Sequence, residues 1–127
     1  MRILLDTHIF LWYINGSAQL PERTKDLIRD PDNNVFLSPV TLWEALVKYR
    51  LGKLPLPDRP ETYLPIQRAR HGIATLDLDE ASVARLAELP NLHRDPFDRM
   101  LICQALEHAL TLVTVDPAIR AYPVKTR

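Results

Sequence analysis

The fold is decided by one stretch near the end of the chain, residues 96–115, PFDRMLICQALEHALTLVTV. Apolar side chains recur at Phe97, Leu101 and Ala105, which is the spacing of one helix face. Residues 111–115 form a continuous apolar run rich in β-branched residues, which is typical of a buried strand. A helix that leads directly into such a strand indicates a parallel sheet that is covered on both faces.

The rest of the chain repeats this alternation of short apolar runs and longer amphipathic runs. Further strands are predicted over residues 3–5, 35–37, 72–75 and 124–126. Further helices are predicted over residues 7–14, 21–30, 38–50, 61–70 and 79–89. Residues 54–60, LPLPDRP, are predicted to form an extended connection. We therefore expect one three-layer α/β domain over residues 1–127, with helices on both faces of its sheet.

Composition narrows the possible classes of protein. The chain has 127 residues, and its 16 basic side chains balance its 16 acidic ones, which excludes a strongly basic nucleic-acid coat protein. A single cysteine excludes an intrachain disulfide and a cysteine-rich zinc site. Asp6 interrupts the apolar start before it reaches the length of a signal sequence, and no membrane-spanning run follows. We expect a cytoplasmic protein.

Acidic residues fall where a parallel sheet of this kind places its sites, outside the carboxyl ends of the strands. Asp6 and Asp116 each follow a predicted strand, and Asp95 and Asp98 open the predicted helix at 96–109. If the strands are neighbours, these acids and Glu44 converge at one edge of the sheet. Clustered carboxylates repel one another unless a cation is present, and Mg²⁺ or Mn²⁺ prefers such oxygen ligands. The pattern indicates metal-dependent hydrolysis of phosphodiesters.

Most of these acids also have a purely structural interpretation. Asp95-Pro96-Phe97-Asp98 is a good helix start in its own right, with Asp95 as the cap and Asp98 in the first turn. Asp6 and Asp116 can cap helices in the same way. Glu44 differs, because it lies inside the apolar run LWEALV, where a carboxylate is costly unless it is paired or bound to a metal.

Two further patterns concern binding partners. Basic side chains near the acids could bind the phosphate backbone of a substrate, and the candidates are Lys48, Arg50, Lys53 and Arg99. The predicted helices at 7–14 and 38–50 carry more bulky apolar residues than one buried face needs, so an exposed apolar groove is expected. These residues are Phe10, Leu11, Trp12, Tyr13, Leu42, Trp43, Leu46 and Tyr49.

Four segments resemble a known family. LLDTH at 4–8 is similar to the start of a PIN domain, SPVTLWE at 38–44 and LVTVD at 112–116 match its later acidic segments, and HRDPFDRMLICQA at 93–105 is the most specific match. The ordered set, which covers essentially the whole chain, resembles the VapC-type ribonuclease toxins of type II toxin–antitoxin systems.

The resemblance implies a PIN-like domain with a central parallel sheet of four to five strands and helices on both faces. It implies a Mg²⁺- or Mn²⁺-dependent endoribonuclease that is neutralised by a VapB-like antitoxin and forms a homodimer. Carried over by position, the catalytic and metal-binding acids are Asp6, Glu44, Asp98 and Asp116. Asp95 and Thr114 are supporting residues in the same comparison.

Two alternatives remain open at this point. A phosphohydrolase could use Asp6 as its nucleophile, but that chemistry usually needs a second aspartate two residues on, where His8 stands. A non-catalytic interaction module would explain the acids as caps and surface charges, although it leaves Glu44 unexplained.

Overall fold

The computed structural model describes all residues from Met1 to Arg127. The four strands are β1 (Arg2–Leu5), β2 (Asn34–Leu37), β3 (Ala74–Thr75) and β4 (Thr111–Val113). The helices are α1 (Thr7–Asn15), α2 (Glu22–Arg29), α3 (Pro39–Arg50), α4 (Pro60–Arg70), α5 (Glu80–Ala84), α6 (Pro96–Glu107) and α7 (Pro117–Arg120), with a 3₁₀ turn, η1 (Arg85–Ala87), after α5.

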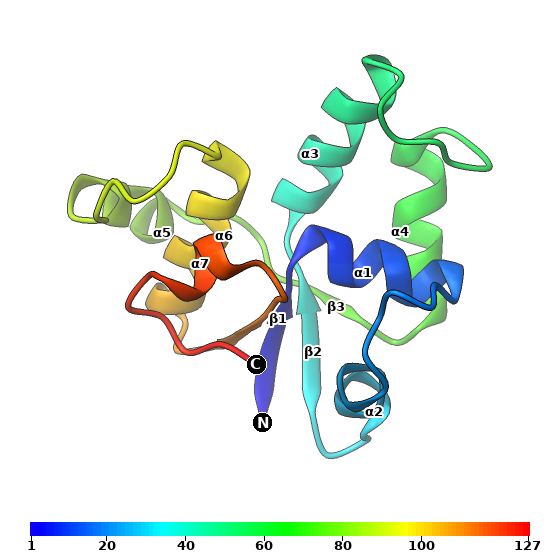
Figure 1. The fold of residues 1–127 in the computed structure, drawn as a ribbon, viewed down its shortest axis with the longest axis horizontal. Helices are drawn as coiled ribbons and strands as arrows, with labels where there is room; N and C mark the ends of the chain where they lie inside the picture. Colours follow the sequence, from blue (N-terminus) through cyan, green and yellow to red (C-terminus); the bar gives the residue numbers. More distant parts are fainter.

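All strands pair in parallel, in the order β3-β2-β1-β4. Figure 1 shows the three layers, with α1, α2 and α4 on one side of the sheet and α5, α6 and α7 on the other, while α3 rises beyond the carboxyl end of β2. The predicted α/β fold class, with four strands and helices on both faces, is confirmed.

Two apolar cores, one on each face of the sheet, hold these layers together. Alternate side chains of β1 separate between them, so that Ile3 and Leu5 join the core under α1 and α2 while Leu4 joins the core under α6. All three are fully buried, as expected for a strand in the middle of a covered parallel sheet. The helices are amphipathic because each has one such core to face.

Three predicted elements differ from those observed. The strand expected over 111–115 ends at Val113, because its partner β1 ends at the paired residue Leu5, after which Asp6 caps α1. The strand expected over 124–126 is reduced to a single bridge between Leu112 and Thr126. The helix expected over 79–89 tightens into a 3₁₀ turn at Arg85, a geometry that places side chains three apart on the same side.

The strand order locates the place where a site is expected. From β1 the chain moves outward through β2 to β3, and then returns to the opposite side of β1 as β4. The order therefore reverses between β1 and β4, and open α/β sheets bind ligands in the crevice outside the carboxyl ends of the strands at such a point. Asp6 and Thr114 follow these two strands directly.

Candidate active site

The amino ends of several helices meet at this edge of the sheet, and each begins with a side-chain cap. Asp6 caps α1, Ser38 caps α3, Asp95 caps α6 and Asp116 caps α7, and each accepts a hydrogen bond from a backbone N–H of the first turn. The partial positive charge at a helix amino end favours nearby anions. The edge is therefore suited to hold negative charge.

Asp6 lies at the centre of the crevice between β1 and β4. Its side chain is buried, and the Thr114 hydroxyl donates to its Oδ2 at 2.8 Å while the Thr7 N–H donates to its Oδ1 at 2.7 Å. Burial raises the pKa of Asp6 above its ordinary value, although Thr114 and the nearby His8 ring favour the ionised form. Asp6 is thus both fixed in place and kept away from solvent.

Glu44 is brought to the same place by two contacts of residues that precede it in α3. Thr41 shares a hydrogen bond of 3.0 Å with Thr7 at the start of α1, and the Trp43 ring packs edge-on against Phe97 at the start of α6, with centroids 4.8 Å apart. Glu44 is 2% exposed, and its charge contributes to the raised pKa of Asp6.

The carboxylate of Glu44 is only half satisfied. Its Oε2 accepts from the ammonium of Lys48, one turn later on α3, and its buried Oε1 has no hydrogen-bond partner. Lys48 is one-third exposed and also interacts electrostatically with Asp95 and Asp98. A buried carboxylate oxygen without a donor is unfavourable, so this atom is a candidate ligand for a cation.

Asp98, in the first turn of α6, has the most perturbed carboxyl group. Burial raises its pKa to about 7, and the charges of Asp6, Asp95 and Glu44 add to the effect. His93 Nε2 lies 3.1 Å from its Oδ2 and opposes the shift. Without a cation, this carboxyl group therefore keeps its proton to a much higher pH than an ordinary aspartate does.

The two remaining acids are occupied by helix caps. Asp95 Oδ1 accepts from the N–H groups of Phe97 and Asp98, and Asp116 Oδ1 accepts from the N–H of Ala118. Asp95 still takes part in the electrostatics of the cluster, because its charge acts on Asp98. Asp116 is connected through its backbone, since its N–H donates to the Thr114 hydroxyl.

The structure therefore brings together Asp6, Glu44, Asp95 and Asp98 as mutually interacting charges, with Asp116 beside them across Thr114. No three acidic, histidine or cysteine side chains are close enough to share one ion as they stand. The donor set nevertheless fits Mg²⁺, which typically takes one or two carboxylates directly and keeps several waters. The unpartnered Glu44 oxygen is the atom that fits such an ion best.

The basic residues that were predicted to bind the substrate backbone lie partly in this cluster and partly on the surface. Lys48 pairs with Glu44 inside the cluster, whereas Arg50 and Lys53 are exposed at the end of α3 and beyond it. Arg99 lines an open cleft of about 490 Å³ with Asn91, Leu92, His93 and Arg94, next to Asp98. Its Nη1 donates to Pro90 O and to the Tyr122 hydroxyl.

Sequence reasoning missed two residues that contact the site, His93 and Tyr122. His93 bonds to Asp98, and the Tyr122 hydroxyl lies 2.9 Å from His93 Nδ1. Burial alone would lower the pKa of His93, but the hydrogen bonds with Tyr122 and Asp98 raise it above its ordinary value. No local pattern links a tyrosine to a histidine 29 residues away.

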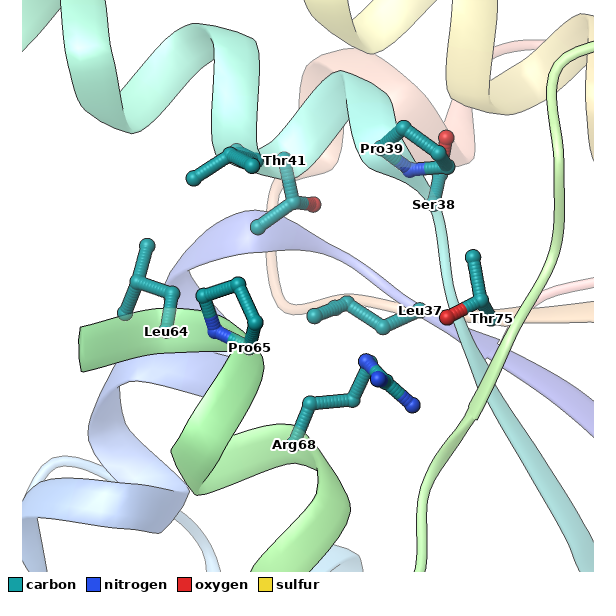
Figure 2. Close-up of a pocket in the computed structure, with 9 residues that line it drawn as sticks. Leu37, Ser38, Pro39, Thr41, Leu64, Pro65, Arg68 and Thr75 are labelled. Atoms are coloured by element: carbon teal, nitrogen blue, oxygen red, sulfur yellow. The ribbon is translucent and has the colours of Figure 1, made fainter. Parts of the chain in front are cut away.

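A separate, mainly apolar pocket lies behind the site. Figure 2 shows Leu37, Pro65 and Arg68 lining this cavity of about 150 Å³, between the start of α3 and α4. The Arg68 Nη1 donates to Ile73 O at 2.8 Å. None of the five acids lines this pocket, which therefore lies apart from the carboxylate chemistry.

Comparison with known proteins identifies the family. The sequence matches the PIN domain over residues 3–125, and the chain belongs to this family. Among characterised relatives, it is 35% identical over 68 residues to ribonuclease VapC16 of Mycobacterium tuberculosis, a match covering 54% of this chain and 48% of that protein. It is 25% identical over 126 residues to ribonuclease VapC22 of the same organism, covering 94% of this chain and 91% of that protein.

Solved structures agree with this assignment. VapBC2 from Rickettsia felis, bound to a promoter DNA fragment, superposes with a TM-score of 0.74 at 20% identity, over 100% of this chain and 98% of that one. FitAcB from Neisseria gonorrhoeae superposes with a TM-score of 0.62 at 25% identity, over 98% and 95%. The predicted resemblance to VapC-type PIN domains is confirmed. No helix is long and apolar enough to cross a membrane.

Proposed function

We propose that this protein is a cytoplasmic endoribonuclease toxin that hydrolyses RNA phosphodiester bonds with Mg²⁺ or Mn²⁺ and is held inactive by a VapB-like antitoxin. The observation that carries the proposal is the unpartnered, buried Oε1 of Glu44 beside the perturbed carboxyl group of Asp98. Strongly perturbed acids at the carboxyl edge of a parallel sheet favour a functional site over a structural one.

Each acid has a distinct role in this proposal. Asp6, Glu44 and Asp98 bind the cation, and Asp116, which lies across Thr114 from them, acts on it through water. Thr114 holds the Asp6 carboxylate with its hydroxyl, and Asp95 adds negative charge while fixing the start of α6. A divalent cation bound here would make water more acidic and offset charge on a phosphate.

Lys48 partly neutralises the negative charge of the metal-free site. Its ammonium occupies Glu44 Oε2 and partly compensates the charges of Asp95 and Asp98. Its one-third exposed side chain is long and flexible, so it can turn toward solvent or a phosphate when a cation enters. We therefore assign Lys48 to charge compensation as well as to RNA binding.

The cleft next to Asp98 supports a polyanionic substrate. Arg94 and Arg99 line this opening of about 490 Å³ together with His93, which bonds to Asp98, so a phosphate chain bound there would lie near that carboxylate. Arg50 and Lys53 provide exposed positive charge further along α3. The neutral overall charge favours a local contact with RNA over a long basic surface.

Partners are proposed from the exposed apolar side chains of α3. Trp43, Val47 and Leu51 are 52%, 38% and 64% exposed, and they are spaced four residues apart along one helix face. Of the eight bulky residues expected to form a groove, Phe10 and Leu11 are instead buried in the core, whereas Trp43 and Tyr49 are exposed. We propose that an antitoxin segment and a second copy of this chain cover this surface.

The two alternatives have less support. A non-catalytic module does not explain why Glu44 is buried with one oxygen unpartnered. A phosphohydrolase that uses Asp6 as nucleophile usually needs a second aspartate two residues on as its acid–base group, and His8 stands at that position.

The decisive experiment is to sequence RNA ends after brief expression of the wild-type chain and of Glu44→Gln. New ends should appear only with the wild type, and the purified protein should cut the same RNA with Mg²⁺ or Mn²⁺ but not with a chelator. Glu61→Gln, on the exposed start of α4, is the matched control and should remain active. Equal cleavage by wild type and Glu44→Gln would refute the assignment.

A second experiment tests the partners. Light scattering should give a dimer of the isolated chain, and pull-down with the neighbouring small protein of its operon should give an inactive complex. Val47→Glu should weaken that complex while leaving RNA cleavage intact. A monomer that binds no small partner would remove the toxin–antitoxin part of the proposal.

A further inference from the structure

The Tyr122 hydroxyl is the centre of a hydrogen-bond network behind the carboxylates. Tyr122 is 3% exposed, and its oxygen lies within hydrogen-bond distance of four groups. These are the backbone N–H of Leu92 at 3.2 Å, the backbone N–H of His93 at 3.1 Å, Arg99 Nη1 at 3.0 Å and His93 Nδ1 at 2.9 Å.

The chemistry of these four partners determines where each proton lies. A backbone N–H and a guanidinium nitrogen can only donate, so three of the four partners direct protons at the phenolic oxygen. The phenol has one proton of its own, and the only neighbour able to accept it is His93 Nδ1. If Nδ1 carried a proton, the buried phenol proton would have no acceptor, which is unfavourable.

The position of the second ring proton follows. Neutral imidazole carries one proton, so when Nδ1 accepts from Tyr122 the proton is on Nε2. His93 Nε2 lies 3.1 Å from Asp98 Oδ2, and an N–H at this atom donates to the carboxylate. The ring of His93 also packs edge-on against that of Tyr122, with centroids 5.3 Å apart, which limits its rotation.

We propose that Tyr122 and His93 are positioning residues of the active site, which fix the histidine tautomer so that its Nε2–H holds Oδ2 of Asp98 and leaves Oδ1 free for the cation. The inference rests on the proposed function in assigning Asp98 to the cation. Asp98 Oδ1 accepts no hydrogen bond within the protein. The opposite tautomer would turn a lone pair of Nε2 toward the ionised carboxylate that binds a cation, and Oδ2 would lose the hydrogen bond that orients it.

The tautomer can be observed without RNA or metal. In ¹⁵N-histidine-labelled protein, at a pH where His93 is neutral, long-range proton–nitrogen spectra should show His93 protonated on Nε2. Tyr122→Phe should shift His93 toward a mixture of tautomers. Tyr63→Phe, which removes a hydroxyl from a residue packed against the other core, should leave the His93 spectrum unchanged.

The positioning role is tested by a double-mutant cycle on Mn²⁺ affinity. Tyr122→Phe should weaken Mn²⁺ binding about tenfold, within the range expected for groups that orient a metal ligand. In a His93→Gln background the amide can donate to Asp98 without help from Tyr122, so the same change should then have little effect. A loss of equal size in both backgrounds would mean that Tyr122 acts only on stability, and would overturn the inference.

The outcomes separate this inference from the proposed function. His93 protonated on Nδ1 in a wild-type protein that binds Mn²⁺ and cuts RNA would overturn the inference alone. A wild-type protein that neither binds Mn²⁺ nor cuts RNA would overturn the proposed function and, with it, the role of Asp98 in holding a cation. Unchanged Mn²⁺ affinity in Tyr122→Phe would also refute the positioning role.

Discussion

Two groups of carboxylates stand at the same edge of the sheet and are held in opposite ways. The inner carboxylates, Asp6, Glu44 and Asp98, are buried, and in two of them burial raises the pKa. The outer carboxylates, Asp95 and Asp116, are partly exposed, and each caps a helix.

We interpret this difference as one between acids that stabilise the fold and acids that are proposed to bind the cation. A cap has its charge satisfied by backbone N–H groups at a helix amino end, so it stabilises the fold without any ligand. The inner carboxylates are destabilised by burial and mutual repulsion, and such a cost persists in proteins mainly at functional sites. Asp6 belongs to both groups, because it also caps α1.

The largest expected effect is on catalysis, and it should be larger for the inner carboxylates than for the outer ones. Asp98→Asn, Glu44→Gln and Asp6→Asn should each reduce metal-dependent RNA cleavage by roughly 100-fold or more, because groups that only orient a ligand already cost about 10–100-fold. Asp116→Asn should cost about tenfold, since it acts through water, and Asp95→Asn should cost less. Rates from a purified, chelator-washed sample at saturating Mn²⁺ would measure this order.

A larger loss of RNA cleavage in the variants of the outer carboxylates than in those of the inner carboxylates would contradict this comparison. If Asp116→Asn or Asp95→Asn abolished cleavage while Asp98→Asn left it intact, the outer carboxylates would be the metal ligands. The circular dichroism of each variant should match that of the wild type, because an amide keeps the shape of the carboxyl group and removes repulsion.

The next effect concerns the pH dependence of stability. The Asp98 pKa rises from 3.8 to about 7, so between these values the native state retains a proton that the unfolded chain has lost. The free energy of unfolding therefore decreases as pH rises through this window, at about 1.4 kcal/mol per pKa unit. Asp6 and His93, whose pKa values are also raised, act in the same direction.

Urea unfolding at pH 5 and pH 7, with a chelator present, would measure this dependence. The wild type should lose at least about 1 kcal/mol more than Asp98→Asn over that interval. Equal losses in the two proteins would mean that Asp98 titrates normally and that the inner carboxylates do not interact.

Metal binding should stabilise the inner carboxylates specifically. At a Mn²⁺ concentration about 100 times the dissociation constant, linkage adds about 2.7 kcal/mol to the free energy of unfolding. Glu44→Gln should lose most of this increment, whereas Glu61→Gln should keep it. Thermal unfolding with and without Mn²⁺ gives the comparison directly, and an increment that survives in Glu44→Gln would place the ion elsewhere.

The smallest expected effect is on the free energy of unfolding, when a helix cap among the outer carboxylates is removed. Asp95→Ala should lower the free energy of unfolding by about 1 kcal/mol, while Asp95→Asn should leave it nearly unchanged, because asparagine caps equally well. Denaturant titration would resolve the pair. A large loss with asparagine would show that the charge of Asp95, and not its hydrogen bonds, holds the start of α6.

The elements of the fold were predictable because their signals are local. The period of the apolar residues and the helix caps predicted the bounds of α1, α3 and α6 to within one or two residues. Proline indicated the first residue of α3 and of α6. The strand at 111–115 was predicted too long because apolar composition does not reveal that its partner strand, β1, ends opposite Val113.

The site was predictable only in part, for the same physical reason. The acids were selected by the rule that sites follow strand ends, and Glu44 by its apolar neighbours. Lys48 stands four residues after Glu44, a spacing that favours an ion pair on a helix. The pair was not predicted, because Lys48 was interpreted as a residue that contacts RNA. Tyr122 had no signal, because its contact with His93 exists only once α6 and α7 have packed.

The bond between Asp6 and Thr114 has a consequence for the synthesis of the protein. The two residues are 108 positions apart, so the crevice cannot close while the ribosome is still making the middle of the chain. At about 5–20 residues per second, translation from Asp6 to Tyr122 takes on the order of ten seconds. The proposed nuclease site is therefore incomplete for nearly the whole time that the chain spends on the ribosome, and a protein made at the same moment has that interval to become available before the proposed activity can begin.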